Sequence, residues 1–185
     1  MILPIHVYGS PVLREIAKPV DLKMEGLKQL LDDMYETMKS ADGVGIAAPQ
    51  VGKSLRVVIV DGTDLVEDFP ELKDFKRYMI NPEIIEESDM EVEYSEGCLS
   101  VPDIHCDVYR PEWIKVRYTN ENFEEVEEKF EGFGCRMVEH ELDHLEGHMF
   151  VDRVSAIRKK LISGKLRNIE HGKFAPRYRV APIKK

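Results

Sequence analysis

The chain has 185 residues, of which 43% are hydrophobic and 33% are charged. This length fits one compact domain, and the composition excludes a disordered chain and an integral membrane protein, because no apolar run approaches the roughly 18 residues that span a bilayer. The formal net charge is −9, but residues 158–185 hold ten Lys or Arg and one acid, whereas the rest of the chain holds 16 basic and 34 acidic residues.

The first half of the chain predicts two helices and one buried strand. Residues 11–17 predict a short helix. Residues 25–40 predict a longer one, because apolar side chains recur three or four positions apart, namely Leu27, Leu30, Leu31, Met34 and Met38. Residues 43–50 contain too many small side chains for a regular helix or strand. The β-branched run 55–60 predicts a buried strand, and the acid-rich residues 63–76 predict an exposed loop.

The second half predicts short strands and then two helices. Strand-like sequences occupy residues 78–80, 84–87, 92–94 and 114–119. Residues 123–131 fit either a helix or a strand, but their position after the turn at 119–122 favours a strand. Helices are expected over residues 134–147 and 155–168.

This order of elements predicts an α+β fold, in which short, mainly antiparallel strands surround a central helix and a further helix lies at the C-terminus. We expect one domain over residues 1–168 and a basic tail over residues 169–185. A basic end on an acidic body indicates contact with anionic partners; the alternative is a solvated end that balances the charge of the body.

Residues 140–144 read His-Glu-Leu-Asp-His, the pattern HExxH. On an α-helix His140 and His144 lie one turn apart on the same face, close enough to bind one metal ion. Glu141 lies beside that face, where it can act as a general base. The alternative is a charged helix face with two incidental histidines. The pattern predicts that the central helix binds a metal.

A catalytic metal needs a third protein ligand, and several candidates fail. His148 lies about 80° around a straight helix from His140, too far for one tetrahedral site. The metzincin pattern is lost because Phe150 stands where it requires a histidine. The glutamate of a thermolysin-like enzyme would have to be Glu146 or Glu170, and neither is well placed.

Cys98 lies in the turn-like segment Glu-Gly-Cys-Leu-Ser at residues 96–100. A thiolate beside two imidazoles suits a divalent transition metal. Taken alone, a cysteine is more often a small buried apolar side chain, which is what we expect of Cys106 and Cys135. Gln50, at the end of segment 43–50, would present an amide donor on a fixed backbone.

Together, the segments Gly-Val-Gly-Ile-Ala-Ala-Pro-Gln at residues 43–50, Glu-Gly-Cys-Leu-Ser at 96–100 and His-Glu-Leu-Asp-His at 140–144 resemble the three motifs of the peptide deformylase family in order and separation. The resemblance covers roughly residues 3–155. It implies a metal-dependent hydrolase that removes the N-formyl group from the initiating methionine of nascent polypeptides and releases formate.

The resemblance also implies roles for individual residues. The metal ligands would be Cys98, His140 and His144. Glu141 would be the general base, and the side chain of Gln50 and the backbone N–H of Leu99 would stabilise charge on the formyl oxygen. One divalent ion per chain is implied, characteristically Fe(II), with Zn(II), Ni(II) or Co(II) able to occupy the site.

The methionine side chain would occupy an apolar pocket beside the metal. The walls implied for this pocket include Val44, Phe133, Met137 and the ring of His140, and Gly45 would contribute backbone contacts to an extended substrate. Two positions depart from the family pattern. Glu139 replaces a usual glutamine and would add a negative charge if it points inward, and Arg136 replaces a commonly apolar residue, so we expect it to reach the substrate's backbone or solvent.

We expect a cytoplasmic enzyme without membrane or DNA contacts, because the N-terminus lacks the features of a signal peptide and three cysteines without a CxxC pair fit a reducing compartment. The basic tail would contact the ribosome. Two alternatives are a zincin-type metallopeptidase and a non-catalytic, ribosome-associated metal-binding module. The presence of Glu141 and Gln50 argues against the second, because a structural site needs neither a base nor an oxyanion donor.

Overall fold

The computed structural model describes residues 1–183, which form three α-helices and seven β-strands. The strands are β1 (Gly45–Ala47), β2 (Val57–Asp61), β3 (Lys76–Glu87), β4 (Glu91–Cys98), β5 (Val101–Pro111), β6 (Trp113–Thr119) and β7 (Glu125–Glu131). The helices are α1 (Leu27–Ser40), α2 (Gly132–Leu145) and α3 (Ala156–Glu170). This architecture confirms the predicted α+β class.

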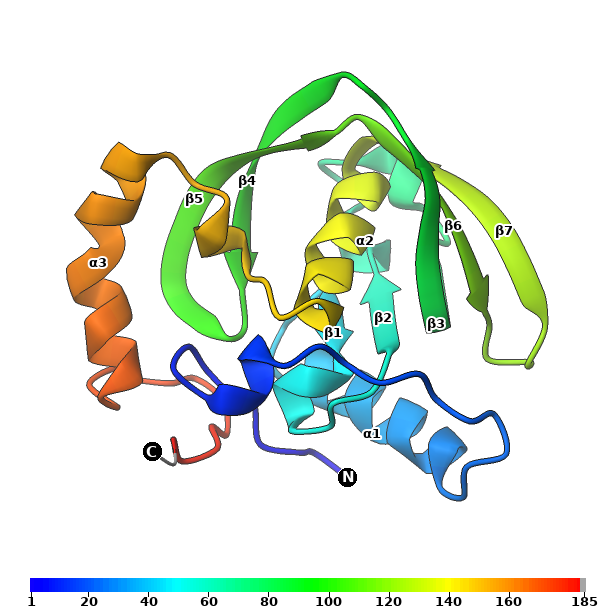
Figure 1. Cartoon of the computed structure of the whole chain (residues 1–185), viewed down its shortest axis with the longest axis horizontal. Coiled ribbons are helices and arrows are strands. Elements are labelled where there is room, and N and C mark those ends of the chain that lie inside the picture. The colour runs from blue at the N-terminus through cyan, green and yellow to red at the C-terminus, as the bar shows by residue number, and fades with distance from the viewer. Residues whose placement is uncertain (184–185) are drawn as a thin grey trace.

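All strand pairs are antiparallel and fall into two sheets. Five strands form one sheet in the order β1-β2-β3-β6-β7, and β4 pairs with β5 in a second sheet. Figure 1 shows α2 inside the arch that the strands form, and α3 at the outer side of β5. Strand β1 is therefore an edge strand, and the central helix lies between the two sheets.

Helix α2 is central because it is buried almost all the way round. Its apolar side chains, including Met137, Val138 and Leu142, pack in one core cluster with side chains of the five-stranded sheet such as Val58 and Val116. Its polar side chains are also buried from Arg136 onward. Buried polar groups need partners, so the helix must carry a network of hydrogen bonds on its other side.

Several predicted elements are confirmed. All five apolar residues of the predicted helix 25–40 are buried in α1. The ambiguous residues 123–131 contain strand β7, as their position after a turn predicts. The sequences 78–80 and 84–87 belong to one strand, β3, which is interrupted by bulges near Asn81, a residue with a positive φ of 51°.

Two predictions near the surface are wrong. Residues 11–17 do not form a helix beyond one 3-10 turn at Pro11–Arg14, because the chain then becomes extended and the N–H of Ala17 donates to the carbonyl of Leu145. The loop 63–76 is not simply exposed. It contains two 3-10 turns, Thr63–Leu65 and Pro70–Leu72, and the side chain of Leu72 is 1% exposed.

Strand β5 has no counterpart among the predicted elements. Its side chains alternate between exposed and buried, with Ile104, Cys106, Val108 and Arg110 on the buried face. This two-residue period is the signal that could have predicted it. The charge of Arg110 masks the pattern, because a buried arginine is rare unless it is paired.

The C-terminal residues return to the body of the molecule. Helix α3 buries Ile162, Leu166 and Ile169, and the chain after it runs back to the N-terminal segment, where Val180 forms a parallel bridge with Ile5. The N-terminal segment and the segment that follows α3 therefore lie side by side, on the same side of the molecule (Figure 1). The division into a domain at 1–168 and a tail at 169–185 stays a prediction, and the last two residues of that tail lie outside the described residues. Within residues 1–183 there is no helix of the length and apolarity needed to cross a membrane.

Candidate active site

Strand β4 and helix α2 bring the three predicted ligands together. Cys98 is the last residue of β4, and His140 and His144 lie one turn apart on α2. One ligand atom from each residue lies within 4.8 Å of the others, and Sγ of Cys98 is 3.4 Å from Nε2 of His144. His148, in contrast, lies beyond the end of the helix and is exposed.

The chemistry of these donors fits a divalent transition metal. Burial lowers the pKa of His144 to about 3, so its imidazole is neutral and can bind a metal. Although burial also lowers the pKa of His140, Cys98 and Glu96 raise it well above its usual value. The surroundings therefore favour positive charge at His140, and a cation would satisfy the same negative groups. Two imidazoles and a thiolate are a donor set that iron, zinc, cobalt and nickel accept.

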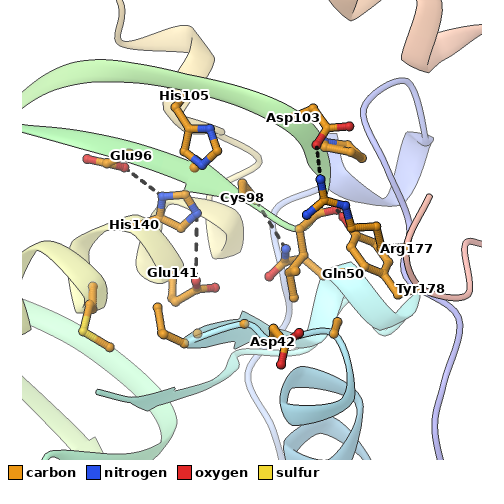
Figure 2. A pocket seen from close by; sticks show the side chains of 18 of the residues that line it. Asp42, Gln50, Glu96, Cys98, Asp103, His105, His140, Glu141, Arg177 and Tyr178 are labelled. Atoms are coloured by element: carbon orange, nitrogen blue, oxygen red, sulfur yellow. Dashed lines mark hydrogen bonds and ion pairs between the residues drawn. The ribbon is translucent and has the colours of Figure 1, made fainter. Parts of the chain in front are cut away.

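Glu141 points into the same space from α2, as Figure 2 shows. Its Oε1 lies 3.9 Å from Nε2 of His140, and its Oε2 is buried without a hydrogen-bond partner within residues 1–183. Burial raises the pKa of Glu141 to about 7. Gly45 leaves room for this side chain, because a Cβ there would lie 2.6 Å from Oε1. A carboxyl with a pKa near neutrality can both accept and return a proton.

The side chain of Gln50 is held in one orientation on the side of Cys98 that faces away from Glu141 (Figure 2). Its Oε1 accepts a hydrogen bond from the backbone N–H of Ala47 at 2.9 Å. The hydroxyl of Ser100 donates to the carbonyl of His6 at 2.6 Å, so its oxygen accepts from Nε2 of Gln50 at 3.0 Å. The same amide nitrogen is 3.5 Å from Sγ of Cys98. The Gln50 amide is therefore a fixed donor beside the cysteine.

A buried charge cluster lies beneath the site and consists of Glu96, Arg110, Arg136 and Asp143. Glu96 accepts hydrogen bonds from Nε and Nη2 of Arg110 and from Nη1 of Arg136, and its Oε1 is 2.8 Å from Nδ1 of His140. Arg110 also donates to Asp143 at 2.6 Å. Although burial raises the pKa of Glu96, His140 and Arg110 lower it well below its usual value. Glu96 therefore stays ionised and holds the His140 ring in place.

The expectation that Arg136 reaches solvent is wrong. Its side chain is 2% exposed, and its guanidinium donates to Glu96 and to the carbonyls of Val92 and Val108. Contact of Arg136 with a substrate backbone stays a prediction. A buried arginine here needs the acid that Glu96 supplies. Glu139 is also buried, and it accepts a hydrogen bond from the thiol of Cys135 at 3.1 Å. Burial raises the pKa of Glu139 to about 7.

A cavity of about 430 Å³ opens over these groups. Its lining includes the predicted pocket residues Val44, Gly45, Phe133 and Met137, together with Gln50, Cys98, Leu99, His140 and Glu141. Phe133 is supported from behind by Phe69, whose ring stacks on it with centroids 4.2 Å apart. Sequence reasoning missed the contributions of Glu96 and Ser100 to the site. Both stand beside Cys98 in segment 96–100, and that proximity was the available signal.

The lining also contains residues from the C-terminal segment, which sequence reasoning did not place near the site. They are Ala175, Arg177 and Tyr178. Their sequence carries no motif, so only the return of the chain after α3 brings them here.

The carboxyl of Glu141 can act as a general base next to three side chains that can bind a metal ion. This arrangement is typical of hydrolases that use a metal ion to activate water. The fold and the site together thus define the class of metal-dependent hydrolases.

The family follows from the sequence as a whole. A family model described as polypeptide deformylase matches residues 2–160. The chain therefore belongs to the peptide deformylase family. It is a metal-dependent deformylase, as its three motifs predict.

Individual relatives agree with this assignment. The peptide deformylase of Flavobacterium johnsoniae is 44% identical over 187 residues, covering 97% of this chain and 95% of its own. The crystal structure of the Thermus thermophilus peptide deformylase, at 36% identity, superposes with a TM-score of 0.82 and covers 93% of this chain and 99% of its own. The actinonin-bound crystal structure of a class I type b peptide deformylase from Acinetobacter baumannii is 42% identical and superposes with a TM-score of 0.74. The match covers 84% of this chain and 99% of that chain.

Proposed function

We propose that this deformylase removes the formyl group from the N-terminal methionine of nascent polypeptides, with Cys98, His140 and His144 as metal ligands. The observation that carries the proposal is the placement of the three donor atoms within 4.8 Å of one another, with the buried carboxyl of Glu141 beside them. A divalent cation held there would act as a Lewis acid that lowers the pKa of water and draws electrons from the formyl carbonyl.

The protein's own groups move the proton and stabilise the charge. Glu141 accepts a proton from the attacking water as the new bond to the formyl carbon forms. The side chain of Gln50 and the backbone N–H of Leu99 donate to the formyl oxygen as it gains charge. Glu141 then returns the proton to the amine nitrogen as the C–N bond breaks. The products are formate and a free amino terminus.

The walls of the cavity suit a methionine side chain in an extended peptide. Val44, Phe133 and Met137 provide an apolar surface next to the reacting group. Strand β1 is one of the two edge strands of its sheet, and its first residue, Gly45, lines the cavity. A substrate backbone can therefore add to this edge as a further strand.

Substitution of the base tests the mechanism. Glu141→Gln keeps the ligands but removes proton transfer, so we expect metal content to be retained and formate release from formyl-Met-Ala-Ser to fall at least 100-fold. Near-normal activity of the metal-loaded variant would contradict the role of Glu141. An unformylated peptide is the control for peptidase activity, and it should remain uncut.

Substitution of the cysteine tests the ligand set. Cys98→Ala removes a donor atom and is expected to lower metal affinity, whereas Cys106→Ala, which changes a buried cysteine outside the site, should not. Metal analysis after dialysis against a chelator measures the difference. Equal metal retention by both variants would show that Cys98 is not the third ligand.

We further propose Fe(II) as the native ion and the cytoplasm as the compartment. The supporting feature is the thiolate of Cys98, which suits iron in a reducing environment. Iron-loaded protein should lose activity in air through oxidation of iron or of Cys98, and replacement by Ni(II) should slow this loss. Metal analysis of anaerobically purified protein identifies the ion, and an iron form that is stable in air would contradict the proposal.

We also propose that the basic C-terminal region contacts the ribosome. Five basic side chains of α3 are exposed, namely Arg158, Lys159, Lys160, Lys165 and Arg167. Because α3 buries apolar side chains, the test replaces these five by Gln instead of truncating the chain. Ribosome cosedimentation at low salt should be lost and hydrolysis of a free formyl-peptide should be unchanged. Equal cosedimentation of the variant and the wild type would contradict this contact.

A further inference from the structure

The C-terminal segment 172–183 borders the substrate cavity although it lies outside the residues that define the family. The family model ends at residue 160, yet Ala175, Arg177 and Tyr178 line the cavity. Figure 2 shows Arg177 and Tyr178 beyond Gln50 as seen from Glu141, at the opposite end from the metal ligands. This end of the cavity is therefore built from sequence that the three motifs do not contain.

Backbone and side-chain contacts hold the segment against the molecule. The N–H of Ile5 donates to the carbonyl of Arg179 at 2.9 Å, and the N–H of Ala181 donates to the carbonyl of Ile5 at 2.9 Å. The hydroxyl of Tyr178 donates to the carbonyl of Leu99. Burial raises the pKa of Tyr178, so its hydroxyl remains protonated and stays a donor. Tyr178 thus attaches the segment to the residue that follows Cys98.

Arg177 extends from this attached segment over the cavity mouth. Its side chain is 88% exposed, and its Nη2 is 3.8 Å from Oδ1 of Asp103, whose side chain is 68% exposed. A pair this long and this exposed is weak, so the N–H groups of Arg177 are available to a ligand. Asp42, also exposed, lines the same cavity.

The charges at this mouth indicate which ligand group Arg177 would accept. Among the exposed side chains of the lining, the two carboxylates of Asp42 and Asp103 outnumber the guanidinium of Arg177, so a carboxylate ligand would meet a net negative rim and be repelled. An uncharged main-chain carbonyl carries no such penalty and accepts hydrogen bonds from a guanidinium. An extended peptide with its methionine beside Met137 has to leave the cavity, and Arg177 lines its open rim.

We propose that residues 175–178 form a subsite for the peptide residues that follow the formyl-methionine, in which Arg177 donates to a main-chain carbonyl and Tyr178 holds the segment on Leu99. This inference rests on the proposed deformylation of formyl-peptides. It assigns to the C-terminal segment a role in binding the substrate beyond its first residue.

The experiment compares substrates of different length in the metal-loaded, full-length protein. The substrates are formyl-methionine amide, which ends before the subsite, and formyl-Met-Ala-Ser amide, which reaches it. Arg177→Ala should raise KM for the longer substrate about threefold to tenfold, the size expected for one exposed hydrogen bond from a charged donor, and leave the shorter one unchanged. Arg179→Ala is the matched control, because Arg179 is exposed on the same segment but does not line the cavity.

A second variant tests the attachment. Tyr178→Phe keeps the ring and removes the hydrogen bond to Leu99, so it should reproduce the length-dependent rise in KM without changing metal content. Formyl-Met-Ala-Glu amide and formyl-Met-Ala-Gln amide test the ligand group, and Arg177→Ala should affect both to the same extent.

Specific outcomes would overturn the subsite. They are an unchanged KM for the longer substrate in Arg177→Ala, an equal rise for both lengths, or an effect confined to the Glu peptide. Failure of the proposed function itself looks different, because the wild-type protein would then release no formate from either length.

Discussion

Charged side chains gather in two regions of this molecule, and they differ in exposure to water. In the buried charge cluster, the side chains of Glu96, Arg110 and Arg136 are 2–3% exposed. On the outer part of the five-stranded sheet, Arg117 pairs with Glu127 across β6 and β7 at exposures of 44% and 45%. Both regions contain arginine–carboxylate pairs with a closest N···O distance below 3 Å, so distance alone does not distinguish them.

This difference in exposure shows that the surroundings of an ion pair decide how much free energy is lost when one partner is removed. An exposed pair gains little, because water already solvates both ions and salt screens them. A buried pair has lost that solvation, so removing one partner leaves an uncompensated charge. The buried charge cluster also orients His140 through Glu96, and so it connects packing to the metal site.

Arg110→Met should have the largest effect. It leaves Glu96 and Asp143 without their shared partner, and breaking a buried pair costs about 3–5 kcal/mol. Urea unfolding of the metal-loaded protein measures the loss in free energy of unfolding. A loss below 1 kcal/mol would show that the cluster is no more important than a surface pair.

Glu96→Gln should lower both stability and metal affinity, because it removes the charge that pairs with Arg110 and Arg136 and weakens the support of His140. The variant keeps the shape of the side chain but weakens the acceptor for His140, and loss of such support costs about 10- to 100-fold in metal affinity. Competition with a chelator measures the affinity. Glu93→Gln, on the exposed face of β4, is the control and should leave it unchanged.

Glu128→Gln tests a pair of intermediate exposure. Glu128 accepts hydrogen bonds from Arg77 and from the hydroxyl of Tyr118 at 2.6 Å, and although burial raises its pKa, these groups lower it below its usual value. A lowered carboxyl pKa adds stability that is present above the unfolded-state value and is lost as the pH falls through the folded-state value. We expect a loss of about 1 kcal/mol at pH 7 that becomes smaller as the pH falls below the ordinary carboxyl pKa. Urea unfolding over a series of pH values measures it, and a loss that does not change with pH would contradict the linkage.

Arg117→Ala should have the smallest effect. It removes the exposed pair with Glu127, and such pairs contribute about 0.2–1 kcal/mol. The change in free energy of unfolding should be less than 1 kcal/mol in urea and should shrink further in 0.5 M NaCl. A loss as large as that of Arg110→Met would remove the contrast between the two regions.

Features that depend on local spacing could be predicted from the amino-acid sequence alone. The four-residue separation of His140 and His144 on a helix already predicts that they share one face, and the recurrence of apolar residues already predicts α1. The three motif segments, each read within a few residues, were enough to indicate the family and the candidate ligands. These inferences succeed because helix geometry converts sequence distance directly into spatial distance.

The partners of groups that are far apart in the chain, in contrast, depend on how the segments pack in three dimensions. The sequence predicted that Arg136 would extend toward solvent or substrate. It is buried instead, because it pairs with Glu96, which lies 40 positions earlier on strand β4. Strand β5 was not predicted, because the charge of Arg110 interrupts its apolar pattern. Arg110 can be buried because it pairs with Glu96 and Asp143. Tyr178 meets Leu99 across 79 positions because α3 turns the chain back. Burial and charge pairing depend on which segments pack together, and no local pattern carries that information.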